Sequence, residues 1–215
     1  MGFLEVLSRK KSQMIGIIDY GMGNLHSVKN ALDNLYIDSR IIDEAGELTN
    51  FGSLILPGVG SFNRAMSNLD EGGWTDAIIK FSENKPVLGI CLGMQLLFSS
   101  SDEGGHSQGL NLFSGRVKKI SDQNNLKLPH VGWNDLIIKK DCSLLNGINQ
   151  EIDVYFVHSY ECIPDNKSDI SSEVNYGKNI VASVSKDLIF GLQFHPEKSQ
   201  PSGLKMLENF YNLSR

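Results

Sequence analysis

The stretch Lys85-Pro-Val-Leu-Gly-Ile-Cys-Leu-Gly-Met-Gln95 runs from an apolar segment through Gly-x-Cys-x-Gly into a helical pattern. We predict a buried strand over 85–90, a sharp turn at Cys91 and a helix over 92–99. Glycines on both sides of the cysteine let the backbone turn tightly. The helix N-terminus favours a thiolate there. The stretch therefore predicts a nucleophile at the carboxyl end of a strand in an α/β sheet.

The chain before this stretch alternates between strand and helix patterns. Short apolar runs lie at 14–19, 39–43 and 53–57. Residues 25–35, after the first run, and residues 62–82, after the third, have helical spacing. Alternating strands and helices are typical of βαβ units with a parallel sheet. We therefore predict an α/β fold, a flavodoxin-like and mostly parallel sheet with helices on both faces.

The pattern changes after about residue 110, where strand-like segments follow one another without long helices. They lie at 114–120, 135–139, 154–161, 180–185 and 188–194. Lys186-Asp187 has the character of a hairpin turn, and residues 203–213 have the spacing of a closing helix. These features predict an antiparallel extension in the C-terminal half.

Composition excludes several classes of protein. The 215 residues carry a net charge of −5, which argues against nucleic-acid binding because that needs a basic face. No apolar run reaches the length of a membrane span. The three cysteines, Cys91, Cys142 and Cys162, are widely spaced without a CxxC motif, and the five histidines form no HxH or HxxxH pair. We therefore expect neither a disulfide framework nor a metal site.

Residues 1–13 form an N-terminal extension ahead of the first predicted strand. Their apolar patch is short and precedes the charges, which is the reverse of the order in a secretory signal. We expect this segment to lie outside the folded domain, in a cytoplasmic protein.

A second motif, Gln193-Phe-His-Pro-Glu197, follows the strand predicted over 188–194. The carboxyl ends of parallel strands meet at one edge of a sheet, so His195 can reach Cys91. A carboxylate two residues from the histidine can orient the imidazole. The joint occurrence of both motifs predicts a Cys-His-Glu triad of Cys91, His195 and Glu197.

These motifs together resemble the class I, or triad, glutamine amidotransferases. Further motifs narrow the resemblance to the branch of that family whose ammonia is used in imidazole glycerol phosphate synthesis for histidine. They are Ile18-Asp-Tyr-Gly-Met-Gly-Asn24, Pro57-Gly-Val-Gly-Ser-Phe62, Pro129-His-Val-Gly-Trp-Asn134, Tyr155-Phe-Val-His-Ser-Tyr160 and His195-Pro-Glu-Lys-Ser199. The resemblance implies one amidotransferase domain over residues 14–215.

The resemblance also implies roles for individual residues. Cys91 would attack the glutamine carboxamide, His195 would protonate the departing ammonia, and Glu197 would orient His195. The backbone amides of Val59 and Leu92 would form the oxyanion hole. The residues expected to bind glutamine are Gly58, Gln95, Glu103, Ser159 and Tyr160. The residues expected near a partner are Asn24, Trp133, Tyr155 and Lys198.

The family implies no cofactor and a TIM-barrel synthase subunit as the partner in a heterodimer. That partner would join the ammonia to a ribulosyl phosphate intermediate, which gives imidazole glycerol phosphate and an aminoimidazole carboxamide ribonucleotide. Glycines on both sides of Val59 allow its peptide to rotate. We expect the Val59 amide to point away from Cys91 in the isolated subunit and to flip on activation.

Other interpretations stay open on the sequence alone. The same glutaminase chemistry serves sugar amidine formation in surface-polysaccharide synthesis, and cysteine peptidases and gamma-glutamyl hydrolases use a related elbow. A non-catalytic interaction subunit is a further alternative. Gly21-Met-Gly-Asn24 resembles part of a dinucleotide loop, but His26 replaces its third glycine.

Overall fold

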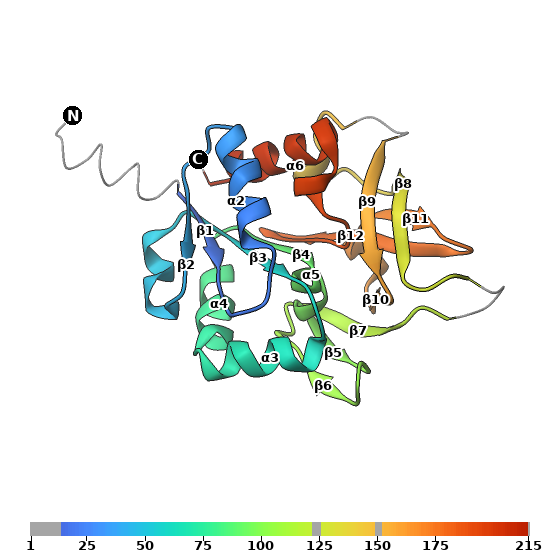
Figure 1. Ribbon diagram of the computed structural model, residues 1–215, viewed down its shortest axis with the longest axis horizontal. Coiled ribbons are helices and arrows are strands. Elements are labelled where there is room, and N and C mark those ends of the chain that lie inside the picture. The colour runs from blue at the N-terminus through green and yellow to red at the C-terminus, as the bar shows by residue number, and fades with distance from the viewer. Residues whose placement is uncertain (1–13, 122–125, 149–151, 215) are drawn as a thin grey trace.

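Five parallel strands form the half of the main sheet that contains Cys91 (Figure 1). The computed structural model describes residues 14–121, 126–148 and 152–214, so the extension predicted over 1–13 lies outside the described residues. The order β2-β1-β3-β4-β13 is the flavodoxin-like order, which confirms the predicted fold class. The strands are β1 (Ile15–Ile18), β2 (Ser39–Ile42), β3 (Ser53–Gly58), β4 (Val87–Cys91) and β13 (Ile189–Leu192).

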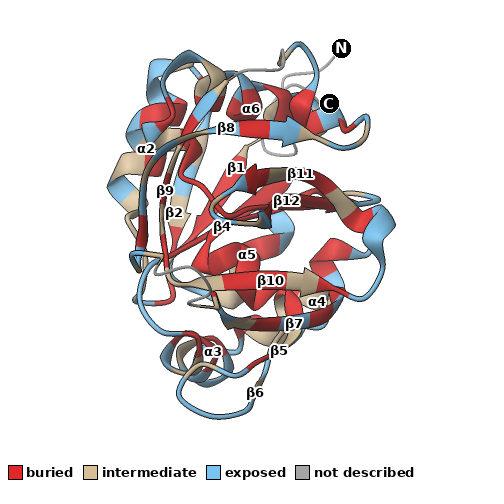
Figure 2. Ribbon diagram, turned by 90° about the vertical axis from the view of Figure 1, so that its right-hand side faces the viewer, coloured by how far each residue is buried: buried red, intermediate tan, exposed pale blue. Residues whose placement is uncertain are grey.

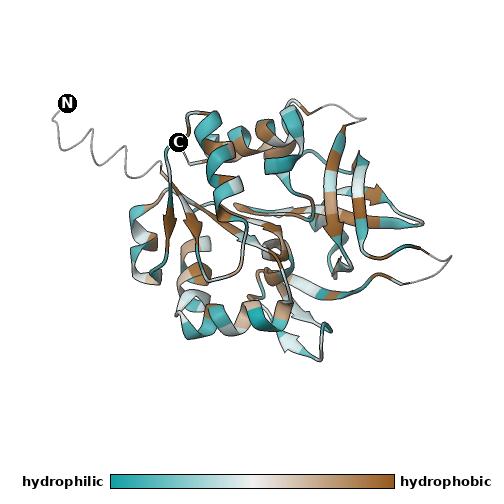
Figure 3. Cartoon of the chain, viewed as in Figure 1, coloured by the Kyte–Doolittle hydropathy of each residue, from teal (hydrophilic) through white to brown (hydrophobic). Residues whose placement is uncertain are grey.

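Helices cover both faces of these strands, and each face has its own hydrophobic core. On one side lie α2 (Leu25–Asn34) and α6 (Gln200–Asn212). On the other lie α3 (Phe62–Glu71), α4 (Trp74–Ser82) and α5 (Leu92–Leu96). Every residue of β1, β3, β4 and β13 is buried, as Figure 2 shows for the centre of the sheet. Burial on both faces explains why these strands are continuous apolar runs (Figure 3).

Antiparallel strands extend the same sheet beyond β13, in the order β13-β12-β11-β8-β9. They are β12 (Asn179–Lys186), β11 (Ile170–Asn175), β8 (His130–Ile138) and β9 (Asp153–His158). Lys186 pairs with Ile189, and Asp187 between them has a φ of 52°. The antiparallel extension and its hairpin are therefore confirmed, but the turn residues are Asp187 and Leu188, because Lys186 is the last residue of β12.

A second, four-stranded sheet has the order β10-β7-β5-β6. Its strands are β5 (Phe98–Ser101), β6 (Ser107–Gln108), β7 (Phe113–Lys119) and β10 (Tyr160–Pro164). The single strand predicted over 154–161 was wrong, because the chain leaves the main sheet at Ser159 and continues in the second sheet. This crossing places Ser159 where the two sheets meet the carboxyl edge of β4.

Other element boundaries also differ from the sequence prediction. The helical pattern over 62–82 is two helices, because Gly73 has a φ of 68° and ends the helical path. The helix predicted over 92–99 stops at Leu96, since Phe98 already pairs with Phe113 in the second sheet. Strand β11 was not predicted. In the described part of the chain there are also short 3-10 helices: η1 (Ala45–Asn50), η2 (Ser143–Leu145), η3 (Lys167–Asp169) and η4 (Pro196–Lys198).

Candidate active site

The turn at Cys91 is held by close backbone contacts on both sides. Cys91 has φ 55° and ψ −109°, a conformation that a residue with a side chain rarely adopts and that marks functional sites. A Cβ atom on Gly93 would lie 1.7 Å from the carbonyl oxygen of Leu56, and one on Gly89 would lie 2.5 Å from that of Gly93. These contacts agree with the expectation that glycines on both sides of Cys91 let the backbone turn tightly.

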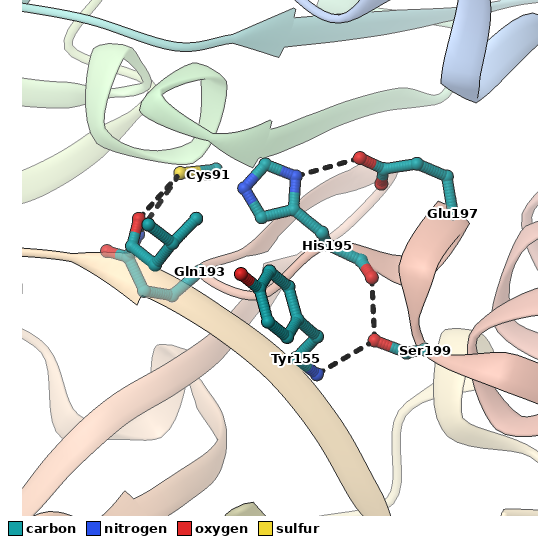
Figure 4. A network of polar contacts seen from close by, with 7 residues as sticks. Cys91, Tyr155, Gln193, His195, Glu197 and Ser199 are labelled. Carbon is teal, nitrogen blue, oxygen red and sulfur yellow. Dashed lines mark hydrogen bonds and ion pairs between the residues drawn. The ribbon is translucent and has the colours of Figure 1, made fainter. Parts of the chain in front are cut away.

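His195 and Glu197 come from the segment after β13 and lie beside Cys91 (Figure 4). The Nδ1 atom of His195 is 2.8 Å from Oε1 of Glu197, and both side chains are almost fully buried. Donation to the carboxylate places a proton on Nδ1. The other ring nitrogen, Nε2, is buried and points toward Cys91 in Figure 4. Nε2 is therefore the atom that can exchange a proton with the thiol.

The charges around His195 favour its protonated form. Burial lowers the pKa of His195, but hydrogen bonding and charge interactions with Cys91 and Glu197 outweigh burial and raise it to about 9. An imidazolium between a sulfur atom and a carboxylate is the arrangement of an activated cysteine. The geometry therefore places a protonated imidazole between the sulfur atom and the carboxylate.

A cavity of about 230 Å³ opens above Cys91 and gathers most of the predicted site residues. The predicted residues that line it are Val59, Cys91, Leu92, Gln95, Glu103, Ser159, Tyr160 and His195. Gly60, Val157 and His158 also line it and were not predicted. These residues come from both sheets, from α5 and from the segments after β3, β5 and β13, so the cavity is a product of the tertiary fold.

Glu103 is fixed in position rather than free in solvent. Its Oε2 atom accepts a hydrogen bond of 2.8 Å from the backbone N–H of Phe62, the first residue of α3. Its own N–H donates to Ser101 Oγ at 3.1 Å. The N-terminal end of a helix stabilises a carboxylate. Glu103 therefore presents an oriented negative charge at the cavity wall.

Gly58 lies behind the triad and not at the cavity wall. A Cβ atom on Gly58 would lie 2.5 Å from the Tyr20 hydroxyl and 2.9 Å from Cβ of Leu92. Gly58 and Asn24 border a small void beside His195 and Glu197. The expected contact of Gly58 with glutamine is thus not visible in the cavity lining, and close packing explains why the residue is glycine.

A family model described as glutamine amidotransferase class-I matches residues 16–213. The chain belongs to the class I glutamine amidotransferase family. Its curated relatives include two proteins named imidazole glycerol phosphate synthase subunit HisH. The one from Caldanaerobacter subterraneus subsp. tengcongensis is 51% identical over 92% of this chain and 97% of that protein. The one from Moorella thermoacetica is 46% identical over 94% of this chain and 95% of that protein.

Solved structures share the fold of this amidotransferase at low sequence identity. A crystal structure of a glutamine amidotransferase superimposes with a TM-score of 0.73 at 18% identity, and covers 93% of this chain and 98% of that chain. PurLQS from Thermotoga maritima gives a TM-score of 0.75 at 19% identity, with 93% of this chain and 97% of that chain covered. These likenesses establish the architecture.

Three of the residues expected near a partner, Tyr155, Trp133 and Lys198, form a layer that continues outward from the triad. The Tyr155 ring lies 6.4 Å from that of His195, and the Trp133 ring lies 5.8 Å beyond it. Lys198 Nζ lies 5.5 Å above the Tyr155 ring, within the range of a cation–π contact. Trp133 is 42% exposed, so it is not a core aromatic residue of this amidotransferase.

A serine outside the predicted set ties this layer to the triad. Ser199 Oγ donates to the carbonyl oxygen of His195 at 2.6 Å and accepts from the N–H of Tyr155 at 3.0 Å. The N–H of His195 donates to the carbonyl oxygen of Tyr155 at 3.0 Å. The loop that contains His195 is thereby fixed to β9 (Figure 4).

Sequence reasoning also missed two neighbours of the sulfur atom. Gln193 Nε2 and the carbonyl oxygen of Val157 each lie 3.9 Å from Cys91 Sγ. Gln193 stands two residues before His195, and alternate residues of an extended segment face the same side. That spacing was the signal that could have identified it.

Within the described ranges, no helix is long and apolar enough to cross a membrane. Among those residues, no group of three or more His, Cys, Asp or Glu side chains could hold a metal ion.

Proposed function

We propose that this chain hydrolyses glutamine to glutamate and ammonia and delivers the ammonia to a synthase subunit of histidine biosynthesis. The observation that carries the proposal is the His195–Glu197 pair beside Cys91 on its strained turn. Membership of the family and the names of the curated relatives support the same reaction.

In the proposed mechanism, Cys91 gives its proton to His195 Nε2 and its sulfur attacks the side-chain carbonyl carbon of glutamine. The backbone amides of Leu92 and Val59 hold the oxyanion of the tetrahedral intermediate. His195 then protonates the leaving ammonia, which leaves a glutamyl thioester on Cys91. Water hydrolyses the thioester to glutamate and restores the thiol.

Glutamine would occupy the cavity above Cys91. Gln95, Glu103, Ser159 and Tyr160 line that cavity and supply its polar groups. The carboxylate of Glu103, which is held by the α3 N-terminus, would pair with the α-amino group of the substrate. Gly58 would support the loop that contains Val59 from below.

The partner is a TIM-barrel cyclase that docks over this edge as the second subunit of a heterodimer in the cytoplasm. Val59, Val131 and Trp133 are large apolar residues that are between 42% and 54% exposed. Exposed apolar residues at the mouth of a site indicate a surface that another protein covers. Docking there would enclose the ammonia before it is lost to water. Asn24, Tyr155 and Lys198 would lie at the same interface.

The proposal is tested by measuring glutamate release from glutamine with the full chain, alone and with the barrel subunit from the same genome. We expect weak release alone, stimulation by the barrel subunit and its ligand, and loss of activity in Cys91→Ala. Cys142→Ala, which changes a buried free cysteine outside the cavity lining, is the control and should retain activity.

Absence of glutamate release in the assembled complex would refute the glutaminase proposal. Cleavage of peptides or folates in place of glutamine would favour a hydrolase of another kind. Stimulation by a sugar-modifying partner, without stimulation by the barrel cyclase, would move the same chemistry to surface-polysaccharide synthesis.

A further inference from the structure

The buried amide of Gln193 connects two parts of the site. Gln193 follows β13 and is fully buried. Its Oε1 atom accepts a hydrogen bond of 3.1 Å from Gln95 Nε2. Its Nε2 atom lies 3.9 Å from Cys91 Sγ and is oriented as a donor to it (Figure 4). One side chain therefore contacts both the nucleophile and a residue of the glutamine cavity.

The contact with Gln95 determines which end of the Gln193 amide faces the sulfur. A primary amide has an acceptor end and a donor end. Because the N–H of Gln95 occupies the oxygen of Gln193, the Gln193 nitrogen is the atom left for Cys91. The side chain of Gln95 thus sets the orientation of Gln193.

The two neighbours of the sulfur have opposite requirements. The carbonyl oxygen of Val157, 3.9 Å from Sγ, can only accept, so it favours the protonated thiol. The Gln193 N–H can only donate, so it favours the thiolate. Cys91 is only 7% exposed, and a buried charge depends strongly on such donors.

We propose that Gln193 is a further catalytic residue, whose side-chain N–H donates to the Cys91 thiolate. This inference rests on the proposed function, in which Cys91 is the nucleophile. The proton leaves Sγ for His195 Nε2, and the Gln193 donor stabilises the negative charge that stays on sulfur. Sulfur loses that charge when it bonds to the substrate carbon. Gln193 therefore increases the fraction of Cys91 present as thiolate, and it does not make each thiolate more reactive.

The test measures the rate at which iodoacetamide alkylates Cys91 in the full chain from pH 5 to pH 10, quantified by mass spectrometry of the Cys91 peptide. Gln193→Leu removes the donor at similar volume, and Gln193→Glu replaces it with a negative charge. We expect the midpoint of the alkylation profile to rise by about one pH unit in Gln193→Leu. At pH values below the midpoints of wild type and variant, the variant should then react roughly tenfold more slowly. Gln193→Glu should shift the midpoint further, with a similar plateau rate in both.

A matched control separates this role from a structural one. Ser183→Ala removes a buried polar group of the adjacent strand β12, which bonds to Ser172 Oγ and not to the sulfur. The control should leave the alkylation midpoint unchanged. His195, Tyr20 and Cys162 are the titratable groups whose charges interact with Cys91, and they are the same in every variant.

An unchanged or lowered midpoint in both Gln193 variants would overturn the proposal. If a variant fails to fold, the Gln193 side-chain amide of the wild-type chain supplies the answer by NMR. In the wild type, the resonance should shift with pH at the alkylation midpoint, and in Cys91→Ser this shift should be absent. A wild-type resonance that does not change with pH would also overturn the proposal. Glutamate release is measured separately, so failure of the glutaminase function is distinguishable from failure of the Gln193 assignment.

Discussion

The protonation of His195 depends on the atoms that touch it. Its pKa of about 9 reflects burial, which lowers it, and the opposing effects of Cys91 and Glu197. We predict that Cys91→Ser lowers the pKa of His195 from about 9 toward 6.5, because serine stays neutral where cysteine can ionise. NMR titration of the imidazole would measure the change. Cys142→Ser is the control, and a pKa that stays near 9 in Cys91→Ser would contradict the ion pair.

The same pKa has a consequence for stability. The folded-state value of His195 lies above its ordinary value of 6.5. Its contribution to folding is therefore complete below pH 6.5 and is lost as the pH rises through 9. In Cys91→Ser this alkaline loss should be smaller than in the wild type.

Glycine at the turn is a second requirement at the level of single residues. We predict that Gly93→Ala lowers the free energy of unfolding by more than about 4 kcal/mol or prevents folding, because its Cβ would overlap the Leu56 carbonyl oxygen. Urea titration measures the loss. Gly46→Ala is the matched control, since no atom lies within 4 Å of its added Cβ. Equal stability of the two variants would contradict this account of the turn.

The pairing of β8 with β9 buries two histidines opposite each other. His158 Nδ1 lies 2.7 Å from the carbonyl oxygen of Tyr160, which can only accept, so Nδ1 carries the hydrogen. His158 Nε2 lies 3.0 Å from Nδ1 of His130, whose Nε2 lies 2.7 Å from the side-chain oxygen of Asn134. Burial lowers the pKa of His158, and the charges of His130 and His195 lower it further. The hydrogen bond to Tyr160 opposes them, and the result is a pKa of about 4. Protonation of His158 would place a positive charge in this buried pair, which burial disfavours.

We predict that this pair of strands loses stability in acid. Because the folded-state pKa of His158 lies below 6.5, its contribution is complete above pH 6.5 and is lost as the pH falls toward 4, by roughly 3 kcal/mol in total. Urea titrations at pH 7.5 and 4.5 would measure the loss. His158→Gln, whose amide can donate to Tyr160 and does not titrate, should show a smaller difference between the two pH values. An equal difference would contradict the prediction.

The whole molecule presents the triad at one edge, beside exposed apolar residues. We predict that Trp133→Ala raises the Kd for the barrel subunit at least about tenfold, because buried tryptophans dominate interface energies. Calorimetry of the two purified subunits would measure it. The control is Tyr36→Ala, which removes another exposed aromatic residue at the C-terminal end of α2. Similar Kd values for Trp133→Ala and wild type would place the interface elsewhere.

The sequence by itself determined the parallel half of the fold and the positions of Cys91, His195 and Glu197. Apolar runs buried on both faces, glycines at a tight turn and a His-Pro-Glu motif are local signals, and each follows from the chemistry of neighbouring residues. The same local reasoning missed the left-handed Gly73 that divides the helix. It also failed at Ser159, where the change of sheet depends on distant packing.

Only the tertiary structure decided what surrounds the sulfur. Gln193 follows β13 and Val157 lies in β9, both far from Cys91 in the chain. Pairing of β13 with β4 brings Gln193 to the sulfur, and the carbonyl of Val157 reaches it from β9. The orientation of the Gln193 amide in turn depends on Gln95 in α5. Hydrogen bonds between distant segments leave no periodic signal in sequence, so the nucleophile could be predicted from the chain while its electrostatic environment required the fold.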